Sequence, residues 1–455
     1  MPIDLDTPLR WSSANADEKA LLADLQGNIL KGHGRKQTKN MFLQFGNATD
    51  GRSFIKQAAS LVVSAQKQLQ DADAFKKGGA DGGPVVFILL SALGYKALGI
   101  APAQIPGDTA FAAGLKANAA SLNDPPPEHW DETFQADVHA MLIIGATAAQ
   151  QPYVEKQLKG FMAASVKVLG SETGKALFNK NGDGIEHFGY VDGRSQPLVL
   201  VEDIERERDI TDGISVWDPA VGLKQALVPC PGGDTNSFGS YLVFRKLDQN
   251  VKGFKEMEDT LAKTLGLSAG DAERAGAMVV GRFEDGTPVV LQNADGSHHP
   301  VPNNFTYKDD PGGQKCPFQG HIRKSNPRGE SVGTFAADLE EERAHLILRR
   351  GIPFGDRNED LSDRPAKDVG LLFMCYQSDI QNQFEFIQRF WVNNGGFVQP
   401  GTGIDPVIGQ GASTPQSWPT GWGQPEKKDA DFHGFVTMRG GEYFFAPCIG
   451  FLKSL

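Results

Sequence analysis

The sequence has few cysteines and no apolar run long enough to cross a membrane. Its 455 residues include only four cysteines, and none of them forms a C-x-x-C pair. This spacing excludes c-type haem attachment, zinc ribbons and thioredoxin-like chemistry. Four thiols in so long a chain also do not form the dense disulfide framework of a small secreted domain. We therefore expect most of the four, which are Cys230, Cys316, Cys375 and Cys448, to be buried small apolar residues.

Positive charge is also scarce, because 45 basic residues face 56 acidic ones and the net charge is -11. A chain without a broad basic field is a poor nucleic-acid binder. Two local basic clusters, at 321–324 and 349–350, suit a small anionic ligand better. The first residues have neither a basic segment nor an apolar one typical of a secretion signal. The predicted location is the cytoplasm, with non-classical export left open.

Several motifs of common enzyme classes are missing. No G-x-x-x-x-G-K-[ST] or G-x-G-x-x-G stands between a predicted strand and a predicted helix, so phosphate-loop and dinucleotide-binding sites are excluded. The sequence contains no H-E-x-x-H and no G-x-S-x-G. These absences remove the zinc metalloprotease motif and the serine hydrolase elbow.

The hydrophobic pattern has the same order of elements in both halves of the chain. Continuous apolar runs predict buried strands, and apolar residues at helical spacing predict helices. The first half has strands at 40–45, 84–90 and 137–145 and helices at 51–69, 91–98 and 148–169. The second half has strands at 239–245 and 368–376 and helices beginning near 251 and at 380–391. This order predicts a duplicated α+β unit, a split βαβ arrangement with helices on one face of an antiparallel sheet.

The boundary between the two units is predicted in the Pro/Gly-rich region 218–238, which gives domains of 1–225 and 226–455. The segment 394–432 is rich in Gly, Pro, Ser and Thr and has little periodicity. Long segments of this kind are usually functional or mobile.

Three stretches combine charged side chains with residues that specify turns. The first, 189–197, contains Asp192 followed by Gly193, which allows the backbone to turn at either sign of φ. By itself this stretch favours an ordinary Asp-Gly turn over a functional site. The others are Cys-Pro-Phe-Gln-Gly-His-Ile-Arg-Lys-Ser-Asn-Pro-Arg at 316–328 and the arginine-containing stretch 345–355.

These stretches together resemble the dye-decolorising peroxidase family of haem enzymes. The resemblance covers nearly the whole chain and includes Leu-Gln-Gly-Asn-Ile-Leu-Lys-Gly-His-Gly-Arg at 25–35, G-x-x-D-G at 189–193, Arg-Arg-Gly-Ile-Pro-Phe-Gly at 349–355 and Tyr-Phe-Phe-Ala-Pro at 443–447. It implies two ferredoxin-like domains with antiparallel sheets and a haem b cofactor held mainly by the C-terminal half.

The resemblance also implies which residues hold the haem. His321 is expected to be the axial ligand of the iron and the only metal ligand. Asp379 is expected to accept the hydrogen bond of its far ring nitrogen, with Glu385 as the alternative. A carboxylate in that position makes the imidazole more basic and fixes its orientation. Arg323 is a candidate partner of a haem propionate.

On the opposite face, the resemblance implies Asp192 as the acid–base residue and Arg349 as its cationic partner. Asp has an ordinary pKa of about 3.9, so this base works best in acid. The arginine keeps the carboxylate ionised and stabilises developing negative charge. Leu371 and Phe373, on one face of an alternating strand, are expected to shape the same pocket or the edge of the haem.

Trp391, at the end of its predicted helix, matches a tryptophan that some relatives use as a surface radical site. The other interpretation is an aromatic anchor of an amphipathic helix. Where those relatives have tyrosine after Gly-Ile-Pro, this chain has Phe354, which removes one radical relay.

The predicted function is a haem peroxidase that uses hydrogen peroxide to oxidise phenols, aromatic dyes and other small or bulky aromatic donors. The first alternative is a haem-binding storage or sensing protein without turnover. The others are a haem enzyme that inserts oxygen or handles porphyrin, and a non-haem α+β protein. No nucleic-acid or membrane partner is expected, and a homo-oligomer is left open.

Overall fold

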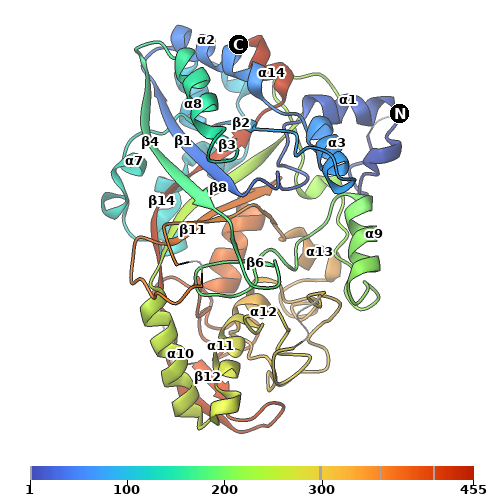
Figure 1. Cartoon of the computed structure of the whole chain (residues 1–455), viewed down its shortest axis with the longest axis vertical. Coiled ribbons are helices and arrows are strands. Elements are labelled where there is room, and N and C mark those ends of the chain that lie inside the picture. The colour runs from blue at the N-terminus through green and yellow to red at the C-terminus, as the bar shows by residue number, and fades with distance from the viewer. Residues whose placement is uncertain (1–2, 297–299, 359, 413–415) are drawn as a thin grey trace.

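The computed structural model describes residues 3–296, 300–358, 360–412 and 416–455. Within them, the main sheet runs in the order β7-β8-β14-β2-β3-β1-β4-β10-β11-β9. Because β8 also pairs with β11, the sheet closes into a barrel, with helices outside it (Figure 1). Both chain termini lie at the upper end of the molecule in this view.

The first half of the barrel is one ferredoxin-like unit. Its strands occur in the spatial order β2-β3-β1-β4, and every neighbouring pair is antiparallel. The strands are β1 (Gln37–Phe45), β2 (Val85–Leu90), β3 (Ala140–Gly145) and β4 (Val166–Lys175), and the crossing helices are α2 (Ala48–Ala58) and α8 (Gln151–Gly160). All residues of β2 and β3 are buried, as their continuous apolar runs predict.

The second half repeats this arrangement with the order β14-β8-β11-β10. Its strands are β8 (Phe238–Gln249), β10 (Ile352–Phe354), β11 (Gly370–Gln377) and β14 (Val436–Ala446). Its helices are α10 (Val251–Leu265) and the π-helical segments η8 (Gln381–Glu385) and η9 (Ile387–Val392). The predicted duplicated α+β fold with antiparallel sheets is therefore confirmed. The domain boundary at 225/226 stays a prediction.

The two halves meet edge to edge. One seam pairs β4 with β10 at Gly174 and Phe354, and the other pairs β14 with β2 at Phe445 and Leu90. Aromatic side chains join the halves internally, since Phe42 of β1 contacts Phe244 of β8 with ring centroids 5.0 Å apart.

Two predicted helices differ from the observed ones. The helix predicted at 51–69 is broken into α2, a 3₁₀ turn η2 (Ala59–Leu61) and α3 (Ala65–Lys76), and Ser64 caps α3 by accepting from Lys67 N. The helix predicted at 148–169 ends at Gly160, and its last predicted residues belong to β4. The segment 394–432 contains the short strands β12 (Gln416–Pro419) and β13 (Lys427–Ala430).

Shorter elements complete the described chain. They are α1 (Ala16–Asp24), α4 (Ala92–Ala97), α5 (Thr109–Ala113), α6 (Leu115–Asn118), α7 (Glu132–Gln135), β5 (Leu177–Phe178), β6 (Gly184–Ile185), α9 (Val201–Ile210), β7 (Val228–Pro229), α11 (Glu273–Val280), α12 (His321–Ser325), α13 (Leu339–Ala344), β9 (Leu348–Arg349) and α14 (Ile449–Ser454). No helix in the described ranges is long and apolar enough to span a bilayer. All four cysteines are buried and unbridged, as expected.

Candidate active site

A large hollow lies where the turn at 189–197 meets the second half of the barrel. It contains about 1540 Å³ of atom-free space. Its walls are mainly apolar and come from β8, α11, α12, β11, η8, η9 and residues 407–410.

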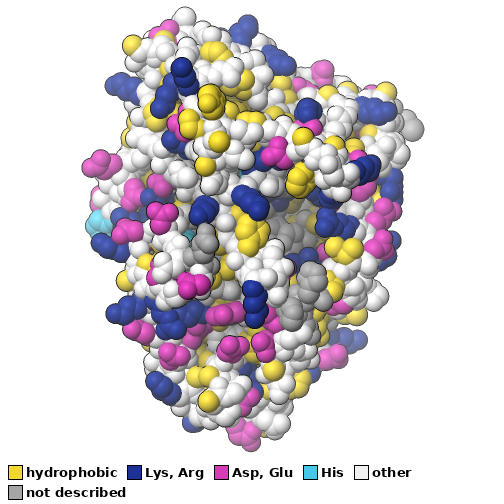
Figure 2. All heavy atoms as spheres, in the orientation of Figure 1, with side chains coloured by type: hydrophobic (Ala, Val, Ile, Leu, Met, Phe, Trp, Pro, Cys, Tyr) yellow, Lys and Arg dark blue, Asp and Glu magenta, His cyan; other side chains and the backbone are white. Residues whose placement is uncertain are grey.

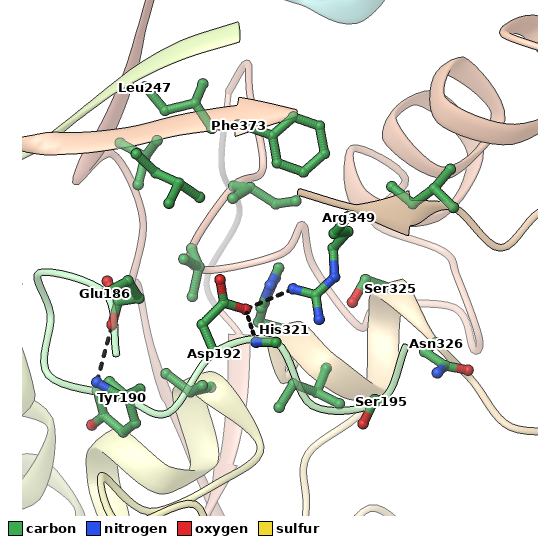
Figure 3. Close-up of a pocket in the computed structure, with 18 of the residues that line it drawn as sticks. Glu186, Tyr190, Asp192, Ser195, Leu247, His321, Ser325, Asn326, Arg349 and Phe373 are labelled. Carbon is green, nitrogen blue, oxygen red and sulfur yellow. Dashed lines mark hydrogen bonds and ion pairs between the residues drawn. The ribbon is translucent and has the colours of Figure 1, made fainter. Parts of the chain in front are cut away.

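Asp192 and Arg349 point toward each other inside this hollow (Figure 3). Arg349 Nη1 donates to Asp192 Oδ1 at 2.8 Å, and Gly193 N donates to the same oxygen at 2.6 Å. The turn can present the carboxylate in this way because Gly193 has a φ of +82°, a conformation that side chains rarely adopt. Arg349 Nη2 donates to the carbonyl of Arg194 at 2.8 Å, which ties β9 to the turn.

The surroundings keep Asp192 ionised. Burial by itself disfavours the charge, but the Arg349 guanidinium and the Gly193 N–H outweigh it, and the pKa of Asp192 is lowered. About a third of each side chain faces open space, 35% for Asp192 and 30% for Arg349. The pair is therefore accessible to a small molecule inside the hollow.

His321 faces the same hollow from α12. Gly320 lets this helix approach α11 closely, because a Cβ at Gly320 would lie 2.9 Å from the carbonyl oxygen of Met278. His321 Nδ1 lies 2.9 Å from Asp405 Oδ2, and Asp405 is fully buried. Burial lowers the pKa of the His321 imidazole, but the Asp405 charge and hydrogen bond raise it further than burial lowers it. The ring is therefore basic, and Nε2 makes no hydrogen bond or ion pair among the described residues.

The predicted partner of His321 is wrong. Asp379 accepts hydrogen bonds from the backbone N and Nδ2 of Asn382, at 2.9 and 2.7 Å. The alternative, Glu385, accepts from the Tyr443 hydroxyl at 2.8 Å. Both carboxylates are engaged locally, and Asp405 from the loop after η9 takes the place assigned to them.

The prediction for Arg323 is also wrong. Arg323 is 1% exposed and does not line the hollow. Its guanidinium binds Asp310 at 2.8 Å and is paired with Glu330 as well. Because both partners are carboxylates, they already neutralise the Arg323 guanidinium, and it is not available to bind an anionic ligand.

Two other buried arginines do lack acidic partners within the part of the chain that the structure describes. Arg282 lines the hollow, and its Nη atoms donate to neutral oxygens, including the carbonyls of Gly286 and Pro302 at 2.8 and 2.7 Å. Arg328 lies beside it and donates to Ser195 Oγ at 2.7 Å. The Nε atoms of both arginines are unpaired. Burial lowers their pKa to about 9 for Arg282 and about 10 for Arg328, and an anion next to them would offset that cost.

Leu371 and Phe373 line the hollow from alternate positions of β11, where the strand pattern places them. Figure 3 shows Phe373 above the Asp192–Arg349 pair. Their contribution to activity stays a prediction.

Trp391 does not lie on the surface. It is 2% exposed and stacks on Phe397, with ring centroids 5.3 Å apart. The neighbouring Phe390 is 47% exposed instead. The prediction of a surface site at Trp391 is therefore wrong in its placement, because the π-helical turn of η9 directs this ring into an aromatic cluster.

A second hollow reaches the same ion pair from another side. It is lined by the N-terminal segment 32–35, the turn at 192–196 and residues 349–353, and it contains about 1010 Å³ of atom-free space. Asp192 and Arg349 line both hollows. The ion pair thus forms part of the wall between them. Basic side chains lie around the middle of the face in Figure 2, where Figure 1 places β6.

Two residues of the site were not predicted from the sequence. Asp405 and Arg282 have no motif around them that signals a ligand. The only local sign for Asp405 is the following proline, which is typical of a turn in which the Asp side chain accepts backbone hydrogen bonds. Lys324 belongs to the basic cluster 321–324 for which a small anionic ligand was expected, but its Nζ donates to the carbonyls of Asn394 and Phe397 instead.

This fold and this arrangement of a basic histidine facing an acid–arginine pair define a haem peroxidase of the dye-decolorising class. Residues 24–176 match the DyP dimeric alpha+beta barrel domain, and residues 278–398 match the Dyp-type peroxidase C-terminal domain. The chain is 50% identical to the multifunctional dye peroxidase DyP2 of an Amycolatopsis species, over the full length of both. The chain therefore belongs to the dye-decolorising peroxidase family.

The solved structures agree. The structure of DyP2 from Amycolatopsis superposes with a TM-score of 0.96 at 49% identity and covers 100% of both chains. A DyP-type peroxidase from Anabaena gives a TM-score of 0.93 at 41% identity, with 98% of this chain and 97% of that one covered. A dye-decolorising peroxidase of Mycetinis scorodonius is 31% identical over 98% of this chain and 89% of its own length. The chain is accordingly a haem-dependent peroxidase active on dyes.

Proposed function

We propose that this enzyme reduces hydrogen peroxide at a haem b and oxidises phenols and aromatic dyes. One observation carries the proposal. Asp192, paired with Arg349, and His321, paired with Asp405, line one mainly apolar hollow. This is the donor set that peroxide cleavage requires, a basic axial ligand and an acid–base group in the same cavity.

The residues present fit the cofactor. His321 would bind the iron through Nε2, and the apolar walls would enclose the macrocycle. Arg282, which is buried and has no acidic partner among the described residues, would meet a propionate, in place of Arg323. When bound, the haem supplies the redox chemistry, and His321 made basic by Asp405 favours cleavage of the O–O bond. Most of these groups belong to the proposed domain 226–455, whereas Asp192 comes from the proposed domain 1–225.

The protein's own part in the peroxide step is proton transfer. Asp192, ionised beside Arg349, would accept the proton of the peroxide on a carboxylate oxygen and return it to the departing oxygen. Arg349 would stabilise the negative charge on that oxygen before the proton arrives. Because both groups are fixed by the turn and by β9, little reorganisation is required.

The visible spectrum of the purified protein and its response to one equivalent of peroxide test the proposal. The wild type should show the Soret band of a histidine-ligated ferric haem that changes rapidly. Asp192→Asn should keep the band but react roughly 10²–10⁴ times more slowly, as for loss of a general base. Asp209→Asn, an exposed carboxylate on α9, is the matched control.

A haem-binding storage or sensing protein would give a different result. Its Soret band would persist without a fast response to peroxide, and Asp192→Asn would then behave like the wild type. Absence of a Soret band after haem is supplied would overturn the proposal altogether.

A further inference from the structure

Two arginines that bind only neutral oxygens line the second hollow. Arg35 donates from Nε to the Gly83 carbonyl at 2.8 Å and from Nη1 to the His33 carbonyl at 3.0 Å. Arg350 donates from all three guanidinium nitrogens to backbone carbonyls, at 2.7–2.8 Å. Within the described ranges, no carboxylate lies at ion-pair distance from either group. Burial lowers the pKa of Arg350 to about 10, so it is still charged at neutral pH. Both guanidinium charges are therefore uncompensated.

The rest of the lining does not balance this charge. Asp192 is the only acidic side chain among the described residues of this hollow, and it is already paired with Arg349. His33 lies between the two arginines and the hollow wall, and burial lowers its pKa to about 4, with the charges of Arg35 and Arg350 adding to the shift. A neutral imidazole and two uncompensated guanidinium groups give the hollow a positive field, which attracts anions.

The hollow also offers free donors beside open space. Arg35 uses two of its five guanidinium N–H groups, and the others have no partner in the part of the chain that is described. The planar fork of a guanidinium matches the two oxygens of a carboxylate. A Cβ at Gly34, Gly184 or Gly193, which line the same hollow, would meet no atom within 4 Å. An organic carboxylate would therefore find both a charged donor and room for its organic part.

The same hollow reaches the proposed proton-transfer group, because Asp192 lines it. We propose that the second hollow admits peroxides whose organic part carries a carboxylate, and that Arg35 and Arg350 bind this carboxylate while the peroxide group meets Asp192. The inference rests on the proposed function and names a further class of oxidant for it. Arg35 and Arg350 are then residues that determine specificity for the oxidant.

The reaction of such a peroxide, ROOH, balances with the donors already assigned to the enzyme. The O–O bond breaks, and Asp192 moves the hydroperoxide proton to the oxygen that carries the organic part, which leaves as ROH. The other oxygen takes up two electrons and two protons and leaves as water. Two molecules of a phenolic donor AH supply them, one electron and one proton each, so that ROOH + 2 AH gives ROH + H2O + 2 A radicals.

The test compares two aromatic peroxy acids on the holoenzyme by stopped-flow spectroscopy in mildly acid buffer. Monoperoxyphthalate carries a carboxylate there, and peroxybenzoic acid is neutral. Arg35→Gln should lower the rate constant for monoperoxyphthalate about tenfold relative to that for peroxybenzoic acid, as for loss of a charged hydrogen bond. Arg35→Lys keeps the charge and should recover most of this ratio. Lys36→Gln removes an exposed charge one position away, outside the hollow, and should leave the ratio unchanged.

Two further measurements do not depend on these rate constants in a variant. In the wild type, the ratio of the two rate constants should fall as salt is added, because ions screen the attraction of the charged peroxy acid. Isothermal titration calorimetry of the holoenzyme with phthalate, which has no peroxide group, measures the anion site directly. Its affinity for phthalate should fall about tenfold in Arg35→Gln.

The outcomes separate this inference from the proposed function. A ratio that Arg35→Gln leaves unchanged, a wild-type ratio that is independent of salt, or phthalate binding that does not need Arg35 would overturn the site. If Arg35→Gln does not fold, the salt dependence of the wild type decides. A wild type that reacts with hydrogen peroxide but not with monoperoxyphthalate would overturn this inference alone, whereas one that reacts with no peroxide would overturn the proposed function as well.

Discussion

At the scale of single residues, the charge of Arg349 controls when Asp192 can act. The guanidinium lowers the pKa of Asp192 against the effect of burial, so the carboxylate persists in acid and the peroxide reaction should slow only as pH falls through that lowered pKa. In Arg349→Gln the pKa of Asp192 should rise, which moves this acid limb to higher pH. The plateau rate should also fall about 10²–10³-fold, as for loss of one charge-stabilising donor.

Stopped-flow measurement of the peroxide rate constant between acid and neutral pH checks both effects. Arg10→Gln, an exposed arginine paired with Glu205, is the control with an unchanged profile. An acid limb in Arg349→Gln that coincides with the wild type would contradict the assigned interaction.

Asp405 gives a second prediction at this scale. Asp405→Asn removes the carboxylate from His321 Nδ1, so the imidazole becomes less basic and the reduction potential should rise. The rate of peroxide cleavage should fall about 10–100-fold, the usual effect of losing such a partner. Asp379→Asn is the matched control, because Asp379 is engaged with Asn382 and should leave potential and rate unchanged. Equal effects of the two substitutions would contradict the geometry.

These residues also show what the sequence could predict. Asp192, His321 and Arg349 stand in stretches whose turn residues and neighbours are specific, and the structure brings all three to one hollow. Asp405 lies 84 positions from its partner in a segment without periodicity. Its contact depends on how that loop folds back over α12, which local pattern does not encode.

At the scale of elements, the π-helical segment η9 is fastened by the buried Trp391. Its ring contacts Phe397, Phe386 and His345. Trp391→Ala should therefore destabilise the protein by about 3–5 kcal/mol, as for other buried aromatic residues. The thermal unfolding midpoint measures this, and Phe390→Ala, on an exposed neighbour, should change it little. A midpoint that falls as far in Phe390→Ala would contradict the assigned packing.

Strand β11 offers a sharper test because its first residue has no room for a side chain. A Cβ at Gly370 would lie 1.9 Å from the carbonyl oxygen of Leu247 on the neighbouring strand β8. Gly370→Ala should cost about 1–3 kcal/mol through overpacking. A Cβ at Gly160 would meet no atom within 4 Å. Gly160→Ala should therefore leave the free energy of unfolding unchanged or raise it by up to about 1 kcal/mol. Chemical denaturation measures the free energy of unfolding of both variants. A Gly370→Ala variant as stable as the wild type would contradict the close approach of β11 to β8.

Element types were largely predictable, whereas their ends were less so. The apolar runs of β2 and β3 are long enough to be recognised as strands. The helix predicted at 148–169 includes the first residues of β4 because Gly170, just past them, is typical of a helix stop. The pairing of β4 with β1 decides in favour of a strand, and that pairing is a long-range contact.

At the scale of the whole molecule, a haem would join the two halves through one shared cavity. Removal of the cofactor should lower the thermal unfolding midpoint, because a ligand at 100 times its dissociation constant stabilises the folded state by about 2.7 kcal/mol. Calorimetry of haem-free and reconstituted protein measures the difference. If the haem-free and reconstituted proteins unfold at the same midpoint, haem binding does not stabilise the folded state.

The duplication could be predicted at this scale, but the closed barrel could not. The two seams between the halves each rest on one paired position, Phe354 with Gly174 and Phe445 with Leu90. The sequence pattern of neither half predicts that its edge strands pair with the other half, since each ferredoxin-like unit is complete in its own strand order.

The position of Asp192 and Arg349 in the wall between two hollows affects how the oxidant and the electron donor reach the site. A small oxidant that enters through the hollow lined by segment 32–35 need not use the same opening as a bulky donor that approaches through the other hollow. The two reactants would then not compete for one access route. A saturating dye would leave the arrival of peroxide unhindered, and the enzyme could run at high concentrations of both without either reactant blocking the other.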